Sequence, residues 1–561
     1  MVPAQVRVSP KGESALEPLV PRPGDDRPDA SRALTRRRLL LVGAQGAALA
    51  ASSGVLAACG AGSTAKTTGT LAKTPAKRGG TLTVGMLGNG SSETLNPVFS
   101  VASVDFMRTT ALFDLLWVTG PDVTSVVPQL VEKAEPSADA KTWTIDLRKD
   151  VKWHDGTPLT ADDLLWTIHA WSDPKSTANG AIAPIIDFAR VRKRGPLTVE
   201  VPLHLSVSEF PSIVSVFGFG VIKNGATNAQ LSSHPVGTGP YKFKSFTAGH
   251  QSVFAANPDY WNGVPSLDTL VVNSTFSDDT ARLNALLSGS VQVAPRTPFL
   301  IAKQQESSSQ VTVMKAHAPN AYMFSLRVDK PPFDDVRVRQ AFKLIADRPA
   351  LISGALAGYG TVGNDLLGLD AKYFANSLAR QQDIAQAKSL LKSAGRAGLS
   401  VTLQTSSAAP GLLEAGTLYA QQAKAAGVNI KVQTLETSEY YTSAGGFLSR
   451  TFGENLNGMA YPSLTSAYLT QLWTKAPYND GHWGSRPNQP DKPLFDAIGT
   501  IDATKAQELW ASVQKTQFDA GPYIIWGNAD FVDLVSPNVR GLKATAAGPL
   551  NNYDFSKAGL A

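Results

Sequence analysis

Cysteine is almost absent from this sequence, and its scarcity excludes a fold held together by internal disulfides. One Cys in 561 residues has no partner within the chain. Long apolar runs are scarce as well, because no stretch of about 18 apolar residues follows Cys59, so the body of the chain is not expected to span a membrane. A large core is still expected, since 43% of the residues are apolar.

A strong excess of positive or negative side chains is also missing. Residues 1–58 carry 8 Lys and Arg against 5 Asp and Glu, so the overall charge of +6 falls to +3 from Cys59 onward. Proteins that bind nucleic acid carry concentrated basic faces. The composition therefore gives no electrostatic case for a nucleic-acid partner.

Catalytic and metal-binding motifs are missing too. No G-x-S-x-G nucleophile motif occurs. Gly237 and Gly239 do not complete G-x-G-x-x-G, and Pro240 lacks a backbone donor, so a tight turn is favoured over a phosphate cradle. No spacing such as H-E-x-x-H links the histidines, which are His154, His169, His204, His234, His250, His317 and His482. The sequence thus predicts no enzyme, no cofactor and no metal site.

The amino-terminal region resembles an export and lipidation signal. Arginines at 36–38 precede a stretch of Ala, Gly and Leu, and Leu-Ala-Ala at 56–58 stands directly before Cys59. This order is similar to a twin-arginine signal joined to a lipoprotein signal, in which the thiol of Cys59 receives diacylglycerol. A transmembrane anchor is the alternative, but Gly, Ser and Gln dilute the apolar run. We expect a signal peptide over 1–58 and an extracytoplasmic protein that is lipid-anchored to the cell membrane.

The folded body is expected to begin near residue 81, after a flexible tether over 59–80 that is rich in Ser, Thr, Ala and Gly. Apolar and polar residues alternate over 81–85 and, strictly, over 143–148, which predicts strands. Thr160 followed by Asp163 predicts the start of a helix. The first part of the chain is therefore rich in strands.

The later part of the chain alternates helices and strands. Residues 399–403 and 428–435 predict strands on either side of a helix over 412–426, which makes a β-α-β unit with parallel strands. Three more helices are expected behind N-capping aspartates: 336–346 after Asp335, 384–394 after Asp383 and 503–519 after Asp502. The change of pattern predicts two differently built α/β lobes, and two lobes form a cleft.

Five segments resemble the extracytoplasmic solute-binding proteins that serve peptide and nickel importers (solute-binding family 5). They are GGTLTV at 79–84 with LNP at 95–97, WTIDLRKDVKWHDGTPLTADD at 143–163, PVGTGPY at 235–241 with NPDYW at 257–261, PPFDDVRVRQA at 331–341 with DR at 347–348, and AKSLLKSAG at 387–395. They keep the order and spacing of that family across most of residues 79–545.

The resemblance implies an α/β fold of the two-lobed periplasmic-binding-protein type (type II, large cluster C) with hinge strands near 322–326 and 523–528. The implied division is lobe I at 81–322 and 527–561, an inserted subdomain around 113–230, and lobe II at 323–526. The implied function is that of a monomeric lipoprotein of an ABC importer, which captures an oligopeptide or peptide-like polar solute by lobe closure and delivers it to the permease and ATPase complex. A binder of a non-peptide solute, such as a metal chelate or a sugar, and a sensory lipoprotein stay open, whereas an exported hydrolase lacks a catalytic frame.

The same resemblance implies ligand contacts at Glu93, Tyr322, Phe324, Arg327, Asn457, Tyr461 and Trp483. Peptide-binding members place an Asp of lobe II against the ligand's ammonium group, but Ala460 stands at that position here. A buried ammonium group without a counter-charge is costly, so a peptide ligand requires another acid, such as Glu454. Arg327 stands where relatives often have Asn, and it either binds a ligand carboxylate or forms a surface ion pair.

Overall fold

The computed structural model describes residues 71, 75–216, 219–440, 446, 448–457, 460–484 and 491–561. The chain divides into two units, Met1–Gly62 and Ser63–Ala561, and the described residues all belong to the second. The expected signal peptide, the lipidation site Cys59 and most of the expected tether lie outside the described residues. Within those residues, no helix has both the length and the apolar character needed to cross a membrane.

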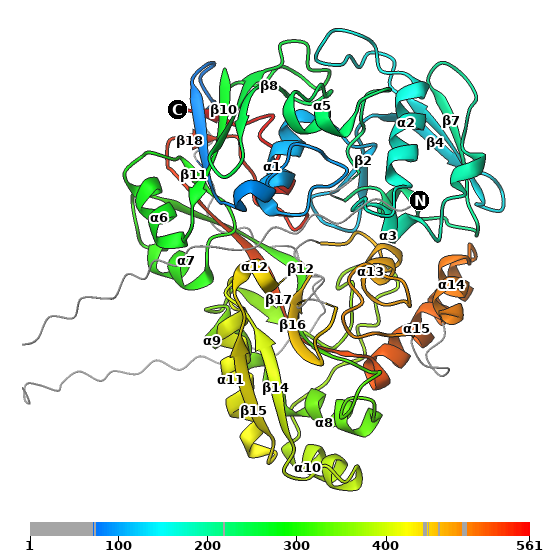
Figure 1. The fold of residues 1–561 in the computed structure, drawn as a ribbon, viewed down its shortest axis with the longest axis vertical. Coiled ribbons are helices and arrows are strands. Elements are labelled where there is room, and N and C mark those ends of the chain that lie inside the picture. The colour runs from blue at the N-terminus through cyan, green and yellow to red at the C-terminus, as the bar shows by residue number, and fades with distance from the viewer. Residues whose placement is uncertain are drawn as a thin grey trace, which may run out of the picture. The chain divides into compact units, whose positions relative to one another are not determined.

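One mixed sheet runs through the second unit (Figure 1) and contains 11 strands among the described residues. Its spatial order is β15 (Asn429–Thr434), β14 (Ser400–Thr405), β16 (Phe452–Leu456), β12 (Thr312–Leu326), β17 (Tyr523–Val535), β11 (Val293–Ala294), β1 (Thr81–Leu87), β10 (Thr269–Phe276), β9 (Gln251–Ala256) and β8 (Tyr241–Thr247), with β13 (Gly360–Val362) pairing with β17 off this path.

Strands β12 and β17 join the two sides of this sheet. One half of the molecule contributes β14, β15 and β16 beyond β12, and the other contributes β1 and β8 to β11 beyond β17. In Figure 1 the two strands lie between these groups of elements. The expected hinge segments 322–326 and 523–528 fall within β12 and β17. The predicted two-lobed α/β fold is confirmed, and the exact lobe limits stay a prediction.

The second half follows the predicted alternation of helices and strands. Strands β14 and β15 are parallel from Ser400 opposite Asn429 to Thr405 opposite Thr434, with α11 (Leu412–Ala425) between them in sequence, which confirms the β-α-β unit. Its other helices are α8 (Val336–Ile345), α9 (Arg348–Ala355), α10 (Ile384–Ser393), α12 (Thr437–Tyr440), α13 (Leu464–Gln471), α14 (Lys492–Ile498) and α15 (Ala503–Ala520).

Aspartate side chains start three of these helices as predicted. Each accepts a backbone N–H group of the first turn at 2.8 Å: Asp335 from Arg337, Asp383 from Gln386, and Asp502 from Lys505. The first N–H groups of a helix have no partner within the helix, so a side-chain oxygen at this position stabilises the start.

The first half contains an insert with its own four-stranded antiparallel sheet. This sheet has the order β4 (Val131–Pro136), β5 (Thr142–Leu147), β7 (Thr198–Pro202) and β6 (Arg192–Lys193). Trp143, Ile145 and Leu147 of β5 are buried, as the alternating pattern predicted. Helix α2 (Ala161–Trp171) begins at the predicted place, where Thr160 donates its backbone N–H to Asp163 at 2.7 Å.

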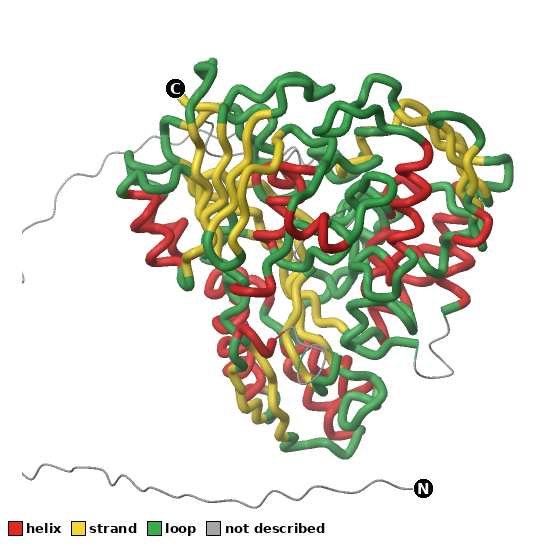
Figure 2. The backbone as a smooth tube through the Cα atoms, turned by 45° about the horizontal axis from the view of Figure 1, so that its top comes forward, coloured by secondary structure: helices red, strands yellow, loops and turns green. Residues whose placement is uncertain are grey.

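Short elements complete the first half, and loops make up much of the chain between them (green in Figure 2). These elements are η1 (Gly90–Ser92), α1 (Ser103–Leu112), β2 (Trp117–Thr119), β3 (Val126–Pro128), α3 (Asn179–Ile182), η2 (Phe188–Arg190), α4 (Phe210–Ile213), α5 (Asn228–Ser233), α6 (Asp279–Leu287), α7 (Phe299–Gln305), β18 (Val539–Arg540), α16 (Leu550–Tyr553) and β19 (Gly559–Leu560).

The largest apolar cluster connects the two halves. It contains Trp143 and Trp171 of the insert together with Tyr461, Tyr468 and Trp510 of the second half. Two further clusters fill the interior of the second half and of the main part of the first half. The described conformation is therefore one in which the insert packs against the second half.

Candidate functional site

The two crossing strands give the site its mechanical frame. Residues 312–316 of β12 pair with 531–535 of β17, and the register shifts between Ala316 and Asn320. Beyond that irregularity, residues 322–326 of β12 also pair with β16 of the second half. At the other end of β17, Val535 pairs with Val293 of β11 in the first half. Each strand is thus shared by both halves, so a movement of one half against the other must bend this pair.

Polar side chains form a closure contact between the insert and α13. The Oγ atoms of Ser212 and Ser463 are 2.7 Å apart. Thr465 donates its hydroxyl to Oε2 of Glu209 at 2.8 Å. Burial raises the pKa of Glu209. These hydrogen bonds exist only while the halves are in contact, so they belong to the closed arrangement.

A cavity of about 160 Å³ lies close to this contact. Most of its wall belongs to the first half, and Ala460 of the second half completes it. Its described lining residues are Thr110, Phe113, Leu115, Val118, Thr119, Val127, Pro128, Gln129, Ser215, Val216, Pro240, Tyr260, Trp261, Asn262, Ala460, Ala547, Asn551, Asn552, Asp554 and Ser556. Ala460 belongs to a small apolar cluster with Ala318 of β12 and Phe531 of β17, so the cavity lies near the crossing strands.

Asp114 fixes the aromatic wall of the cavity from behind. Its buried carboxylate accepts hydrogen bonds at 2.8 to 3.0 Å from Gln129 Nε2, Thr238 Oγ1, Tyr260 Oη and Trp261 Nε1. Burial raises the pKa of Asp114 to about 6, although these donors act in the opposite direction. The side chains of Tyr260 and Trp261 are held in place by this acid and line the cavity.

A left-handed turn forms another part of the wall. The four residues of α16 have positive φ angles of 47°, 55°, 60° and 59°. Such a conformation costs about 1–2 kcal/mol for each residue other than Gly, and Asn tolerates it best. Asn551 and Asn552 occupy the middle of the turn and line the cavity, as does Asp554 directly after it. Strained backbone of this kind persists where surrounding contacts enforce it.

Asp533 of β17 supplies one of those contacts. Its carboxylate accepts the backbone N–H of Leu550 at 3.1 Å and that of Arg296 at 2.9 Å. Burial raises the pKa of Asp533 to about 6. Leu550 and Tyr553 are buried in the core of the first half and hold the ends of the turn. The turn that lines the cavity is therefore attached to a crossing strand.

Comparison with known proteins identifies the family. The sequence model of the bacterial extracellular solute-binding proteins, family 5 Middle, matches residues 125–512, which include most of the insert, β12 and nearly all of the second half. The chain belongs to the family 5 bacterial extracellular solute-binding proteins. The resemblance read from the five segments is therefore confirmed.

Several family 5 proteins can be aligned over most of this chain. The glutathione-binding protein GsiB of Pectobacterium atrosepticum is 27% identical over 451 residues, which cover 77% of this chain and 85% of that protein. The dipeptide-binding protein of Escherichia coli K12 is 26% identical over 505 residues, which cover 84% and 93%. The ABC transporter-associated protein DppA of Helicobacter pylori, solved with the peptide STSA, has a TM-score of 0.75 at 19% identity and covers 86% and 98%.

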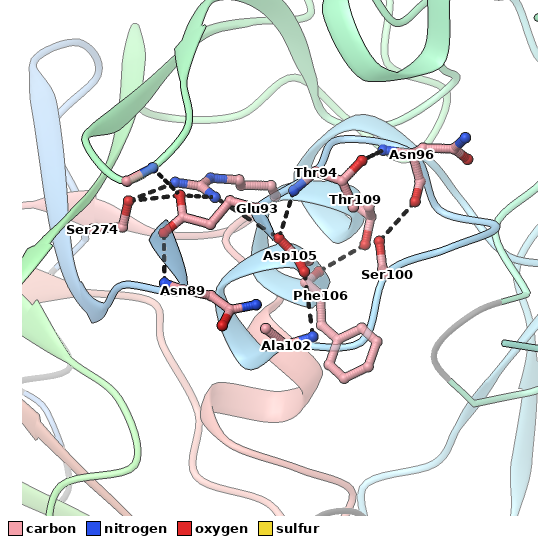
Figure 3. Close-up of polar contacts among 12 residues, drawn as sticks. Asn89, Glu93, Thr94, Asn96, Ser100, Ala102, Asp105, Phe106, Thr109 and Ser274 are labelled. Carbon is pink, nitrogen blue, oxygen red and sulfur yellow. Dashed lines mark hydrogen bonds and ion pairs between the residues drawn. The ribbon is translucent and has the colours of Figure 1, made fainter. Parts of the chain in front are cut away.

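Glu93, expected to contact ligand, lies in a buried polar network (Figure 3). Its Oε2 atom receives Arg108 Nη1 at 2.7 Å, Ser274 Oγ at 2.9 Å and the N–H of Gly249 at 3.0 Å, and its Oε1 atom receives the N–H of Asn89 at 2.8 Å. Burial by itself would raise the pKa of Glu93, but the N–H of Asn89 and the charge of Arg108 lower it overall. The carboxylate holds its own loop, and a ligand contact through it stays a prediction.

Tyr322 and Phe324 lie in the core of the second half. Phe324 is stacked on Tyr419, with ring centroids 4.4 Å apart. Tyr322 packs against Trp526 at 5.6 Å and lines a smaller cavity of about 20 Å³ beside β17. Neither residue lines the larger cavity described above, and their ligand contacts stay predictions.

Arg327 forms an ion pair, one of the two alternatives that the sequence left open. Its Nε atom is 2.8 Å from Oδ1 of Asp329, and its Nη2 atom is 3.1 Å from Oδ2 of the same residue. Nη1 donates to the carbonyl of Ser449 at 3.1 Å. A ligand carboxylate would have to compete with Asp329 for this guanidinium.

Asn457, Tyr461 and Trp483 lie on the second-half side of the closure contact. Gln471 donates to the side-chain oxygen of Asn457, and the backbone N–H of Asn457 bonds to Ala321 of β12 at 2.9 Å. Tyr461 and Trp483 belong to the apolar cluster that connects the halves, and burial raises the pKa of Tyr461 to about 12. None of these three residues lines the larger cavity, and their contacts with a ligand stay predictions.

Glu454 is not placed to replace an acid at position 460. It is fully buried, accepts a hydrogen bond from Thr405 and lies against Gly416 of α11. Burial raises its pKa well above the ordinary value. In the described part of the chain, no group of three or more His, Cys, Asp and Glu side chains is arranged to hold a metal ion.

Sequence reasoning missed Asp554, Asn551 and Asn552. A doublet of asparagines is a signal for left-handed backbone, so the turn itself was recognisable. Nothing in the local sequence shows that this carboxyl-terminal turn faces a cavity bounded by Trp261 and Ala460, because these residues lie far from the turn in the sequence.

Proposed function

We propose that this chain is the substrate-binding lipoprotein of an ABC importer, which captures an oligopeptide or peptide-like polar solute and delivers it to the membrane permease. The cavity at the junction of the insert, the carboxyl-terminal turn and Ala460 carries this proposal, because a solute held there touches both halves. Family membership and relatives named as glutathione-binding and dipeptide-binding proteins support it.

Binding would act through closure. A solute that contacts both halves binds the closed form more tightly than the open form, and so it shifts the population toward the closed form. Bending of β12 and β17 would accompany this movement, and the permease would recognise the closed arrangement. No covalent step is required, so no residue is assigned a catalytic role.

The place of action would be the outer face of the cell membrane. Export by the twin-arginine route and lipidation of Cys59 would anchor the protein as a monomer beside its permease and ATPase. Replacing Cys59 by Ala tests the anchor: the variant should appear in the soluble extracytoplasmic fraction and should take up no labelled fatty acid. A variant that stays in the membrane fraction would contradict the lipid anchor while leaving solute binding untouched.

One observation favours a second candidate function, the binding of a non-peptide solute. Ala460 contributes a methyl group where peptide-binding relatives are expected to have a carboxylate, and a chelate or sugar has no ammonium group to neutralise. Sensing without transport is a further variant of this role. Uptake of the bound solute by cells with and without the protein distinguishes transport from sensing.

Native mass spectrometry of the freshly purified protein and thermal unfolding with a solute panel test the function together. The panel should contain di- to nonapeptides, glutathione, sugars and nickel–histidine. A solute at about 100 times its dissociation constant stabilises the folded state by about 2.7 kcal/mol, which is readily measured. If the protein retains no small molecule and no panel member stabilises it, binding is contradicted. Release of product from peptide or ester substrates would indicate a hydrolase instead.

A further inference from the structure

We propose that the cavity binds the ammonium group of a cationic or zwitterionic solute, and that Asp554 of the first half provides the counter-charge. This inference rests on the proposed solute-binding function and names the chemical class of the solute. It assigns the ion-pairing role to the carboxyl-terminal turn, on the opposite side of the closure from Ala460.

The charges of the cavity wall support a cation. Asp554 is the one acidic residue among the described lining residues, which include no Lys, Arg or His. One of its carboxylate oxygens accepts the N–H of Ser556 at 2.9 Å. In the part of the chain that the structure describes, no cationic side chain lies within ion-pair distance of Asp554. A half-buried carboxylate in this position can form an ion pair with a bound cation.

The aromatic side chains of the wall favour a cation over an anion. Three hydrogen-bond donors of the aromatic wall, Tyr260 Oη, Trp261 Nε1 and Gln129 Nε2, donate to Asp114 and are therefore not directed at an anion in the cavity. Tyr260 and Trp261 both line the cavity, and aromatic rings attract cations. Trp261 already interacts in this way with Arg148, whose guanidinium carbon is 4.9 Å from the ring centroid.

Backbone geometry places Asp554 at the cavity. It directly follows the left-handed turn, which Asp533 holds through the N–H of Leu550 and which Thr545 holds through a 3.0 Å hydrogen bond to Asn551 Oδ1. Since β17 carries Asp533, a cation bound at Asp554 is connected to a strand that must bend on closure. Ala460 then closes the cavity without adding a second charge.

The test uses trialanine amide, trialanine and N-acetyl-trialanine as matched probes, with binding followed by tryptophan fluorescence and thermal unfolding. The two probes with a free ammonium group should bind, and acetylation should reduce affinity at least about tenfold, because it removes the charge that pairs with Asp554. This comparison uses the unaltered protein, so it does not depend on the folding of a variant.

Asp554→Asn keeps an acceptor for Ser556 and should reduce the affinity for trialanine amide at least about tenfold, with little change for the acetylated probe. Asp496→Asn, which removes an exposed carboxylate on α14, is the matched control and should bind as the unaltered protein does. Any one of three results overturns this inference and leaves the proposed function standing. The acetylated and free probes could bind with equal affinity, Asp554→Asn could bind trialanine amide as the unaltered protein does, or solutes of the panel could bind while the ammonium probes do not. If no solute of any class binds, both fall.

Discussion

Buried carboxylates in this protein differ because their surroundings differ. Glu93 is paired with a buried arginine, and its pKa is lowered. Asp480 is fully buried, and burial raises its pKa to about 6, although its hydrogen-bond donors and the charge of Arg450 act in the opposite direction. Asp554 is half-buried at a cavity wall and has no described cationic partner. All three side chains are carboxylates, so the sequence alone could not separate a structural acid from one suited to binding a ligand.

Breaking the Glu93–Arg108 pair should strongly destabilise the fold. Both side chains are fully buried, so Glu93→Ala leaves Arg108 as a buried charge without its main partner. We expect a loss of about 3–5 kcal/mol in the free energy of unfolding, measured by urea denaturation. The exposed pair of Lys492 and Asp496 is the control, and Asp496→Ala should cost less than about 1 kcal/mol. Similar losses in both variants would contradict a structural role for Glu93.

Asp480 should make stability depend on pH. Its hydroxyl donor is Ser325 at 2.6 Å, and burial raises its pKa from 3.8 to about 6. Because the folded pKa is the higher one, its stabilising contribution is fully present below pH 3.8 and is lost as the pH rises through about 6. Asp480→Asn should remove a stability change on the order of 1–3 kcal/mol across this interval, measured by urea denaturation at several pH values. Identical pH profiles for the variant and the unaltered protein would show that Asp480 does not titrate in this way.

Elements whose signals are local in sequence were predictable. The alternation over 143–148, the capping pair Thr160 and Asp163, and the aspartates that start α8, α10 and α15 all depend on neighbours within a few residues. The site depends on distant contacts instead. Glu93 meets Gly249 and Ser274 only after folding, and Ala460 meets the carboxyl-terminal turn only when the halves are in contact. Periodicity contains no information about such pairs.

The PVGTGPY segment illustrates a motif with a packing role. Gly237 and Gly239 run close to the end of α1, and a Cβ atom on Gly237 would lie 1.8 Å from the carbonyl oxygen of Leu112. We expect Gly237→Ala to destabilise the protein by about 2–4 kcal/mol, since backbone must move to relieve the overlap. Gly195→Ala is the control, because its added Cβ meets only the side chain of Thr198, whose hydroxyl oxygen is 3.4 Å away. Equal thermal unfolding midpoints for the two variants would refute the packing role.

At the scale of the whole molecule, closure depends on a small set of contacts. The apolar cluster shared by the insert and the second half already excludes water from much of the contact area. Glu209, Ser212 and α13 add hydrogen bonds that form only on closure. A solute therefore needs to supply only part of the closing free energy. In the proposed function, this division would allow release once the permease separates the halves.

A disulfide across the closure contact should lock the protein shut. The hydroxyl oxygens of Ser212 and Ser463 are 2.7 Å apart, so cysteine sulfur atoms at these positions would lie close together and would have to approach to about 2.0 Å to bond. Oxidised Ser212→Cys/Ser463→Cys, made in a Cys59→Ala background, should release a preloaded solute far more slowly than the reduced form, and small-angle scattering should show no further change on adding solute. Each single variant controls for the substitution itself. Undiminished release after oxidation would mean that solute leaves without separation of the two halves.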